Sequence, residues 1–186
     1  EEAVSMTTTA AVPLEAIIKT WHMPGRYEEG FFEADLLCDI LGRSKSSRLY
    51  NQLLKQQGLF NSIGASITSS LDTGLLIVRG FLNPGVTIEQ AEVAITEVLE
   101  EFVASGPTAE ELEKVKNQSE ATLAFSEVDL LNRAMNLGYA ATAGNPEWAN
   151  QDLERMRAVT LEGVKQQAKQ LLDPSKMATL YYRAQP

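Results

Sequence analysis

Few side chains in this sequence could bind a metal ion. The chain has one histidine, His22, and one cysteine, Cys38. A zinc site needs three or four converging nitrogen, sulfur or oxygen ligands, and a hydrolytic zinc site normally includes histidine. Neither the H-x-x-E-H pattern nor its inverse occurs in the chain. We therefore predict that this chain holds no metal, and that His22 is a hydrogen-bonded structural residue near a strand end.

Nucleophilic catalysis is not favoured either. A Ser–His–Asp triad would have to use His22, and no G-x-S-x-G elbow is present. Gly42, Gly58 and Gly64 are too far apart to form a phosphate-binding loop. Cys38 lies in the apolar run LLCDIL, which favours a small buried hydrophobe over a nucleophile. We therefore expect no catalytic residue in this chain.

One group of carboxylates, Glu110, Glu111 and Glu113, is close enough in sequence to suggest acid–base chemistry. These residues fall in the first turn of an expected helix, which Thr108 and Glu111 open as a capping box. Carboxylates at that end of a helix interact favourably with its dipole. A structural role is therefore favoured for the three glutamates.

Composition indicates a globular chain and limits its partners. The 186 residues suit one domain, 1–186, with residues 1–12 as a lead-in strand or linker. Sixteen Lys and Arg against 25 Asp and Glu give a net charge of −9, which argues against nucleic-acid and anionic-membrane binding. No apolar run approaches the roughly 18 residues of a membrane helix. A chain that begins Glu1-Glu2 is expected to be a fragment or processed product, with a periplasmic and a cytoplasmic parent both open.

The chain is organised around residues 42–61, GRSKSSRLYNQLLKQQGLFN. A small polar turn is followed by an amphipathic helix, in which Leu49, Leu53 and Leu54 form an apolar stripe at helical spacing. Gly58 is expected to end that helix, and a strand with alternating polarity follows at once. The expected solvent side of the helix carries Arg48, Gln52, Lys55 and Gln56.

The other elements complete an α+β pattern. Strands are expected at 14–23, 62–70, 75–82 and 177–183, and helices at 28–41, 88–104, 108–125, 128–143, 148–157 and 160–172. The helix at 128–143 presents a stripe whose small residues suggest close backbone packing: Leu131, Ala134, Met135, Gly138 and Ala141. This order predicts a layered α+β domain, an antiparallel or mixed sheet with helices on one face and a split βαβ-like core with extra helices.

Several short motifs follow one another in a recognisable order. They are WHMP at 21–24, the helix containing LLCDILG, SSRLY at 46–50, the hairpin, TAEELEKVKN at 108–117 and Val159-Thr160. Over about residues 14–186 this order resembles the non-catalytic half-domain of the insulinase/pitrilysin-like zinc metallopeptidases. In that family two similar half-domains enclose a peptide, and one of them binds zinc through the inverted H-x-x-E-H motif.

The resemblance also suggests substrate-contacting positions. In many members an arginine in the helix and a tyrosine seven residues later reach toward the zinc-bound substrate. Aligned on Leu53 and Leu59, those positions are Leu54 and Asn61 here, and neither residue matches the family pattern. Lys55 lies one place from the arginine position. The candidate substrate contacts are therefore Lys55 and Asn61, without a direct role in the transition state.

We therefore predict a non-catalytic, substrate-enclosing domain of a zinc-dependent endopeptidase. A zinc-binding half-domain, in the same parent chain or a partner subunit, would hold the zinc and hydrolyse the peptide substrate with zinc-activated water. A catalytically inactive scaffold or assembly subunit of the same fold is the alternative. A free-standing ferredoxin-like ligand-binding module is a third interpretation. An H-x-x-E-H motif upstream or in an adjacent gene would separate the first interpretation from the other two.

Overall fold

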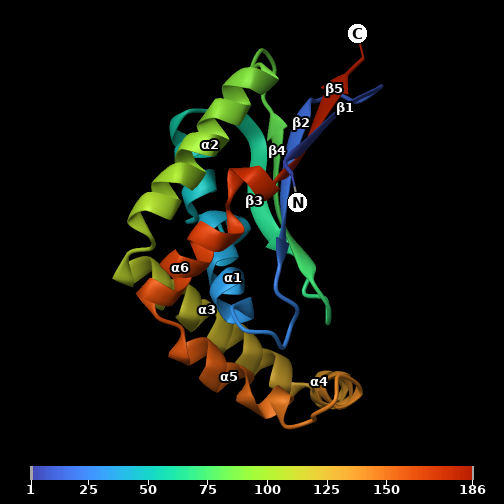
Figure 1. The fold of residues 1–186 in the computed structure, drawn as a ribbon, viewed down its shortest axis with the longest axis vertical. Coiled ribbons are helices and arrows are strands. Elements are labelled where there is room, and N and C mark those ends of the chain that lie inside the picture. Colours follow the sequence, from blue (N-terminus) through green and yellow to red (C-terminus); the bar gives the residue numbers. More distant parts are fainter. Residues whose placement is uncertain (1, 186) are drawn as a thin grey trace.

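The computed structural model describes residues 2–185, which form one mixed sheet with helices packed on one of its faces (Figure 1). The strand order is β1-β5-β2-β4-β3. The strands are β1 (Val4–Ala10), β2 (Ala16–Met23), β3 (Phe60–Ile67), β4 (Gly74–Leu82) and β5 (Ala178–Ala184). β1 and β5 are parallel, and every other neighbouring pair is antiparallel. The predicted fold class is confirmed, and the lead-in segment contains a strand.

The helices form two groups. The first group covers one face of the sheet, whereas α3, α4 and α5 extend beyond one end of it (Figure 1). The elements of the first group are α1 (Phe31–Cys38), the π-helical η1 (Asp39–Arg43) and η2 (Tyr50–Gln56), α2 (Ile88–Ser105) and α6 (Leu161–Leu171). The second group is α3 (Ala109–Val128), α4 (Leu130–Thr142) and α5 (Trp148–Ala158), and a short 3₁₀ turn, η3 (Pro174–Lys176), precedes β5.

Local sequence signals explain where several helices begin. The Thr87 side chain accepts a hydrogen bond from Gln90 N, and the Gln90 side chain accepts one from Thr87 N, which is the capping box that opens α2. The capping box predicted at Thr108 and Glu111 is likewise present at the start of α3. Asp129 separates α3 from α4 because its carboxylate accepts hydrogen bonds from the first amides of α4.

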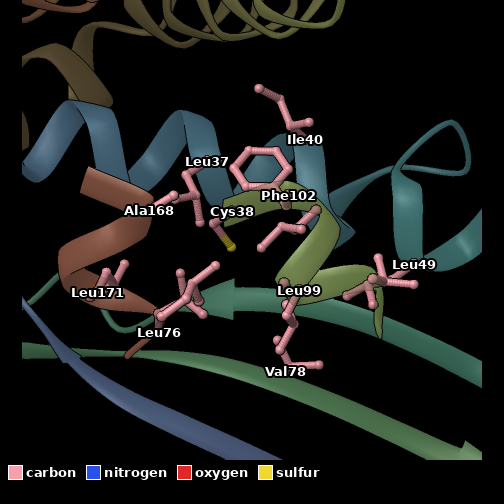
Figure 2. Packing of buried hydrophobic residues seen from close by; sticks show 14 of the residues in the cluster. Leu37, Cys38, Ile40, Leu49, Leu76, Val78, Leu99, Phe102, Ala168 and Leu171 are labelled. Atoms are coloured by element: carbon pink, nitrogen blue, oxygen red, sulfur yellow. The ribbon is translucent and has the colours of Figure 1, made fainter. Parts of the chain in front are cut away.

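The apolar core lies between the sheet and the helices that cover it. Leu49 and Leu53 are fully buried there, as predicted, whereas Leu54 is half-buried at its margin. Figure 2 shows the Cys38 sulfur inside this cluster, between α1 and the strand that carries Leu76 and Val78. Burial raises the pKa of the Cys38 thiol to about 12, so the thiolate form is strongly disfavoured. Cys38 is therefore a buried hydrophobe rather than a nucleophile.

A buried charge network ties α2 to the sheet. Lys19 on β2 is almost fully buried, and its Nζ lies 2.8 Å from Glu92 Oε1 on α2. The Tyr181 hydroxyl on β5 donates to the same carboxylate at 2.7 Å, and Lys19 Nζ also donates to Thr179 Oγ1 at 3.5 Å. Burial acts to raise the pKa of Glu92, but the hydrogen bonds from Lys19 and Tyr181 outweigh it and hold that pKa below its usual value.

The packing predicted for α4 is wrong. The stripe of α4 that was expected to pack closely faces solvent, with Leu131 at 67% and Met135 at 61% exposure. The periodicity correctly predicts an amphipathic helix, but no layer formed by the described residues packs against its apolar side, because α4 lies beyond the end of the sheet (Figure 1).

Candidate functional site

The candidate substrate-contacting residues lie at the junction between η2 and β3. Gly58 ends the helix with a φ of +64°, a left-handed conformation that favours glycine. The amides of Gln57 and Leu59 donate to the carbonyls of Gln52 and Leu53 at 3.1 and 3.0 Å. These bonds satisfy the end of the helix and turn the chain directly into β3.

The end of β4 fixes this junction in place. The Asn83 side chain donates from Nδ2 to the Gly58 carbonyl at 2.7 Å, and Asn83 N donates to the Leu59 carbonyl at 3.0 Å. Asn83 therefore binds the turn after η2 at two successive carbonyls, those of Gly58 and Leu59. A defined turn can present neighbouring side chains in a fixed direction.

The two candidates are presented by different elements. Lys55 is exposed on η2, and its Nζ lies 5.5 Å from the centre of the Tyr50 ring, within cation–π range. Asn61 is exposed on β3, at a bulge where Phe60 pairs with Leu82. The next register pair joins Ser62 to the residue before Leu82, which leaves Asn61 as the extra residue. β3 is an edge strand, so its free backbone groups lie beside Asn61.

A shallow groove of about 460 Å³ runs beside the junction, between the end of η2 and α2. Its acidic members, Glu89 and Glu97, come from α2, and Val93 between them is 58% exposed. Glu89 forms an ion pair with Arg183 at 2.8 Å. Sequence periodicity places Glu89 and Glu97 on the polar side of α2 but does not indicate which neighbouring element they face. The lining residues are Gln57, Leu59, Glu89, Gln90, Val93, Ala94 and Glu97.

An arginine clamp, centred on Arg48 just before η2, connects that helix to α2 and α3. Arg48 was expected on the solvent side, but its side chain is mostly buried. Its Nε and Nη2 each donate to the Glu111 carboxylate at 2.8 Å, Nη2 also donates to the Gly106 carbonyl at 2.9 Å, and the guanidinium lies 4.7 Å from the Phe102 ring centre. Burial acts to raise the pKa of Glu111, but hydrogen bonds from Arg48 and Thr108 lower it to about 2. The structural role predicted for Glu111 is therefore confirmed.

A larger hollow, of about 700 Å³, lies between α1, η1 and α3. Its main charged side chains pair with one another, because Arg43 lies 2.8 Å from Asp35 and 2.6 Å from Asp39. Arg26 similarly lies 2.5 Å from Asp152. Burial raises the pKa of Asp39 to about 6. None of residues 56–61 lines this hollow, and its main charges are already compensated by ion pairs.

The donor set does not suit a zinc ion. Within residues 2–185 no three His, Cys, Asp or Glu side chains come close enough together to hold a metal. His22 lies at the exposed end of β2, whereas Cys38 is buried in α1. In the same part of the chain, no helix combines the length and the apolar character needed to cross a membrane.

Known proteins resemble this chain in sequence and in fold. The family model described as the peptidase M16 inactive domain matches residues 6–119, more than half of the chain. The uncharacterized zinc protease YmxG of Bacillus subtilis is 29% identical over 145 residues. That match covers 77% of this chain but only 35% of the relative, so the chain spans about a third of the curated protein's length.

Solved structures agree in fold. A protease from Helicobacter pylori superposes with a TM-score of 0.91 at 17% identity, covering 98% of this chain and 44% of that chain. The inactive peptidase domain of a putative zinc protease from Bordetella parapertussis superposes with a TM-score of 0.85 at 24% identity, covering 94% of each chain. Together with the family match, these observations show that the chain belongs to the peptidase M16 inactive domain family.

Proposed function

We propose that this chain is the non-catalytic, substrate-enclosing domain of a zinc-dependent endopeptidase. The observation that carries the proposal is the family match over residues 6–119, together with a donor set that does not suit zinc. In this proposal a zinc-binding half-domain, elsewhere in the parent chain or in a partner subunit, hydrolyses the peptide bond. The present domain forms a wall that excludes water and orients the peptide.

The junction between η2 and β3 is the part of this wall that we assign to the substrate. An edge strand can pair with an extended peptide through its backbone, and β3 is an edge strand of the sheet. The acidic groove beside it suits a peptide segment with basic or apolar side chains, because Glu89, Glu97 and the exposed Val93 line it. Lys55 and Asn61 lie on either side of the turn at Gly58 and act as positioning contacts.

Reconstitution with the zinc-binding half-domain tests the proposal. The purified chain alone should not cleave a quenched peptide, because the residues that activate water lie in the other half. Adding the zinc-binding half-domain, expressed separately, should produce cleavage that a zinc chelator abolishes. The zinc-binding half-domain alone should be much slower than the pair. Equal rates with and without this chain, or chelator-sensitive cleavage by this chain alone, would contradict the proposal.

The alternative function is a catalytically inactive scaffold of the same fold. Leu54 and Asn61 favour it, because they stand where many family members carry the arginine and tyrosine that reach the substrate. The half-buried Leu54 packs against the core and does not replace an arginine in reaching solvent. A stable complex that cleaves no peptide, with no H-x-x-E-H motif in any subunit, would establish the scaffold function.

A further inference from the structure

Helix α4 presents its apolar side to solvent. Leu130, Leu131 and Met135 are 81%, 67% and 61% exposed. At 100° per residue these three side chains, with Ala134 and Gly138, fall within one arc of less than half the helix circumference. We call these five residues the α4 face. Scattered apolar residues on a surface need no explanation, but a continuous apolar stripe on a projecting helix marks an interaction surface.

The opposite side of α4 is the side that anchors it. Ala140 is fully buried, and the Tyr139 ring lies 6.4 Å from the Tyr27 ring. Tyr27 in turn stacks on Trp148 at 4.5 Å. Ala140 falls opposite the α4 face and Tyr139 just beyond its edge, so the helix is held in an orientation that turns its apolar stripe outward. The helix lies at the far end of the molecule from α2, and no other element of residues 2–185 covers the α4 face (Figure 1).

Gly138 adds an independent observation. Glycine is a poor helix former, and it is usually found in a helix interior where something approaches the backbone closely. A Cβ added at Gly138 would meet nothing within 4 Å, so no contact within residues 2–185 requires glycine there. By contrast, a Cβ at Gly42 would lie 2.1 Å from the Ala65 amide nitrogen. The glycine in the α4 face is explained if the backbone of another polypeptide packs against it.

We propose that the α4 face is the surface on which this domain docks onto the zinc-binding half-domain. This inference rests on the proposed function and names the partner's contact site. The matched region covers only 35% of the curated relative and 44% of the Helicobacter pylori chain, so more than half of each of those proteins lies outside it. A second copy of this chain is disfavoured as occupant, because each copy carries a net charge of −9 and the two would repel each other.

A binding titration tests the docking surface. The isolated chain is a suitable reagent, because the solved Bordetella parapertussis protein consists almost entirely of this domain. The double variant Leu131→Glu/Met135→Glu should raise the Kd for the separately expressed zinc-binding half-domain at least tenfold. Its circular dichroism and melting temperature should stay unchanged, because both side chains are exposed. Leu161→Glu is the matched control, since Leu161 is 40% exposed at the start of α6, at the other end of α5 from α4.

Gly138→Leu separates docking from helix stability. The new side chain has free space in the isolated domain and improves helix propensity, so the melting temperature should rise or stay the same. The same side chain would prevent close approach of a partner backbone, so the Kd should rise at least tenfold. A merely structural role for Gly138 would move stability and affinity in the same direction.

The possible results distinguish the alternatives. Unchanged affinity in both variants, or no detectable binding of the wild-type chain to the zinc-binding half-domain, would overturn the proposed docking surface. Concentration-dependent dimerisation of the wild-type chain alone, lost in the double variant by sedimentation, would assign the α4 face to a second copy and also overturn it. Because the readout is binding, a complex that docks through α4 but cleaves no peptide would refute the proposed function while supporting this inference.

Discussion

The Lys19–Glu92 pair shows how unequal the two partners of one ion pair are. Lys19 is 1% exposed, whereas the Glu92 side chain is 32% exposed. Removing Glu92 leaves a buried ammonium group with only weak acceptors, and breaking a buried pair in this way costs about 3–5 kcal/mol. Removing Lys19 leaves a carboxylate that water can reach. Loss of Glu92 should therefore destabilise the fold more than loss of Lys19.

We predict that Glu92→Ala lowers the free energy of unfolding by about 3 kcal/mol, at the lower end of that range because Glu92 is partly exposed. Lys19→Met, which fills the same space without a charge, should cost less than about 1 kcal/mol. Urea denaturation of the two variants at neutral pH measures both values. A Lys19→Met variant less stable than Glu92→Ala would contradict this interpretation.

At the scale of single residues, the sequence predicts apolar burial better than polar pairing. Leu49, Leu53 and Cys38 are buried as predicted, because hydrophobicity at helical spacing directly indicates the side that leaves water. Arg48 was misplaced on the solvent side, because its partner Glu111 lies 63 positions away in the sequence. Ion pairs between elements depend on how those elements are arranged in space. The spacing of residues within one helix gives no information about that arrangement.

At the scale of elements, the Arg48–Glu111 clamp joins η2 to the start of α3 and makes a pH dependence predictable. The folded-state pKa of Glu111, about 2, lies below its ordinary value of 4.5. A carboxylate with a lowered pKa adds stability above its unfolded-state pKa, and that stability is lost as the pH falls toward the folded-state pKa. The clamp should therefore stabilise the domain at neutral pH and weaken between about pH 4.5 and 2.

We predict that Arg48→Ala lowers the free energy of unfolding by about 2 kcal/mol at pH 7, the typical value for charged hydrogen bonds. The difference from the wild-type protein should shrink at pH 3, where Glu111 is already protonated in the unfolded chain but still largely charged in the folded domain. Arg183→Ala is the control, because its pair with Glu89 is solvent-exposed and should leave the denaturation midpoint unchanged. A constant Arg48→Ala effect between pH 7 and 3 would show that packing on Phe102, rather than the ion pair, stabilises the junction.

Helix α4 shows the limit of periodicity at the same scale. Its apolar stripe is real, but the assumption that an apolar stripe faces the chain's own core fails for an element beyond the end of the sheet. Capping is predicted more reliably, because a cap is local: the box at Thr108 forms as predicted, and the box at Thr87 has the same local pattern. To predict which side of a helix is covered, one must know every neighbouring element, including any in a partner chain.

At the scale of the whole molecule, the position of Asn61 predicts how little this domain contributes to the chemical step. Asn61 lies on an exposed bulge of an edge strand, with a shorter reach than a tyrosine. Removing a true transition-state donor lowers turnover by about 10²–10³. In the reconstituted enzyme, Asn61→Ala should lower turnover less than tenfold, about 1.4 kcal/mol.

The comparison needs a neighbour on the same strand as control. Ser62→Ala removes a polar side chain from β3 outside the bulged position and should leave turnover unchanged. A hundredfold loss in Asn61→Ala, with an unchanged circular dichroism spectrum, would show that asparagine has taken over the role of the family's tyrosine.

The position of β5 in the sheet has a consequence for biosynthesis. β5 is the last strand of the chain, yet it lies between β1 and β2, the first two. During synthesis, at about 5–20 residues per second, β2, β3 and β4 can pair before β5 leaves the ribosome. Until β5 inserts between them, β1 has no strand to pair with, and one edge of β2 stays unpaired. A nascent chain stalled before residue 178 should therefore expose both strands to chaperones, and protection of the N-terminal strand should be the last event of folding.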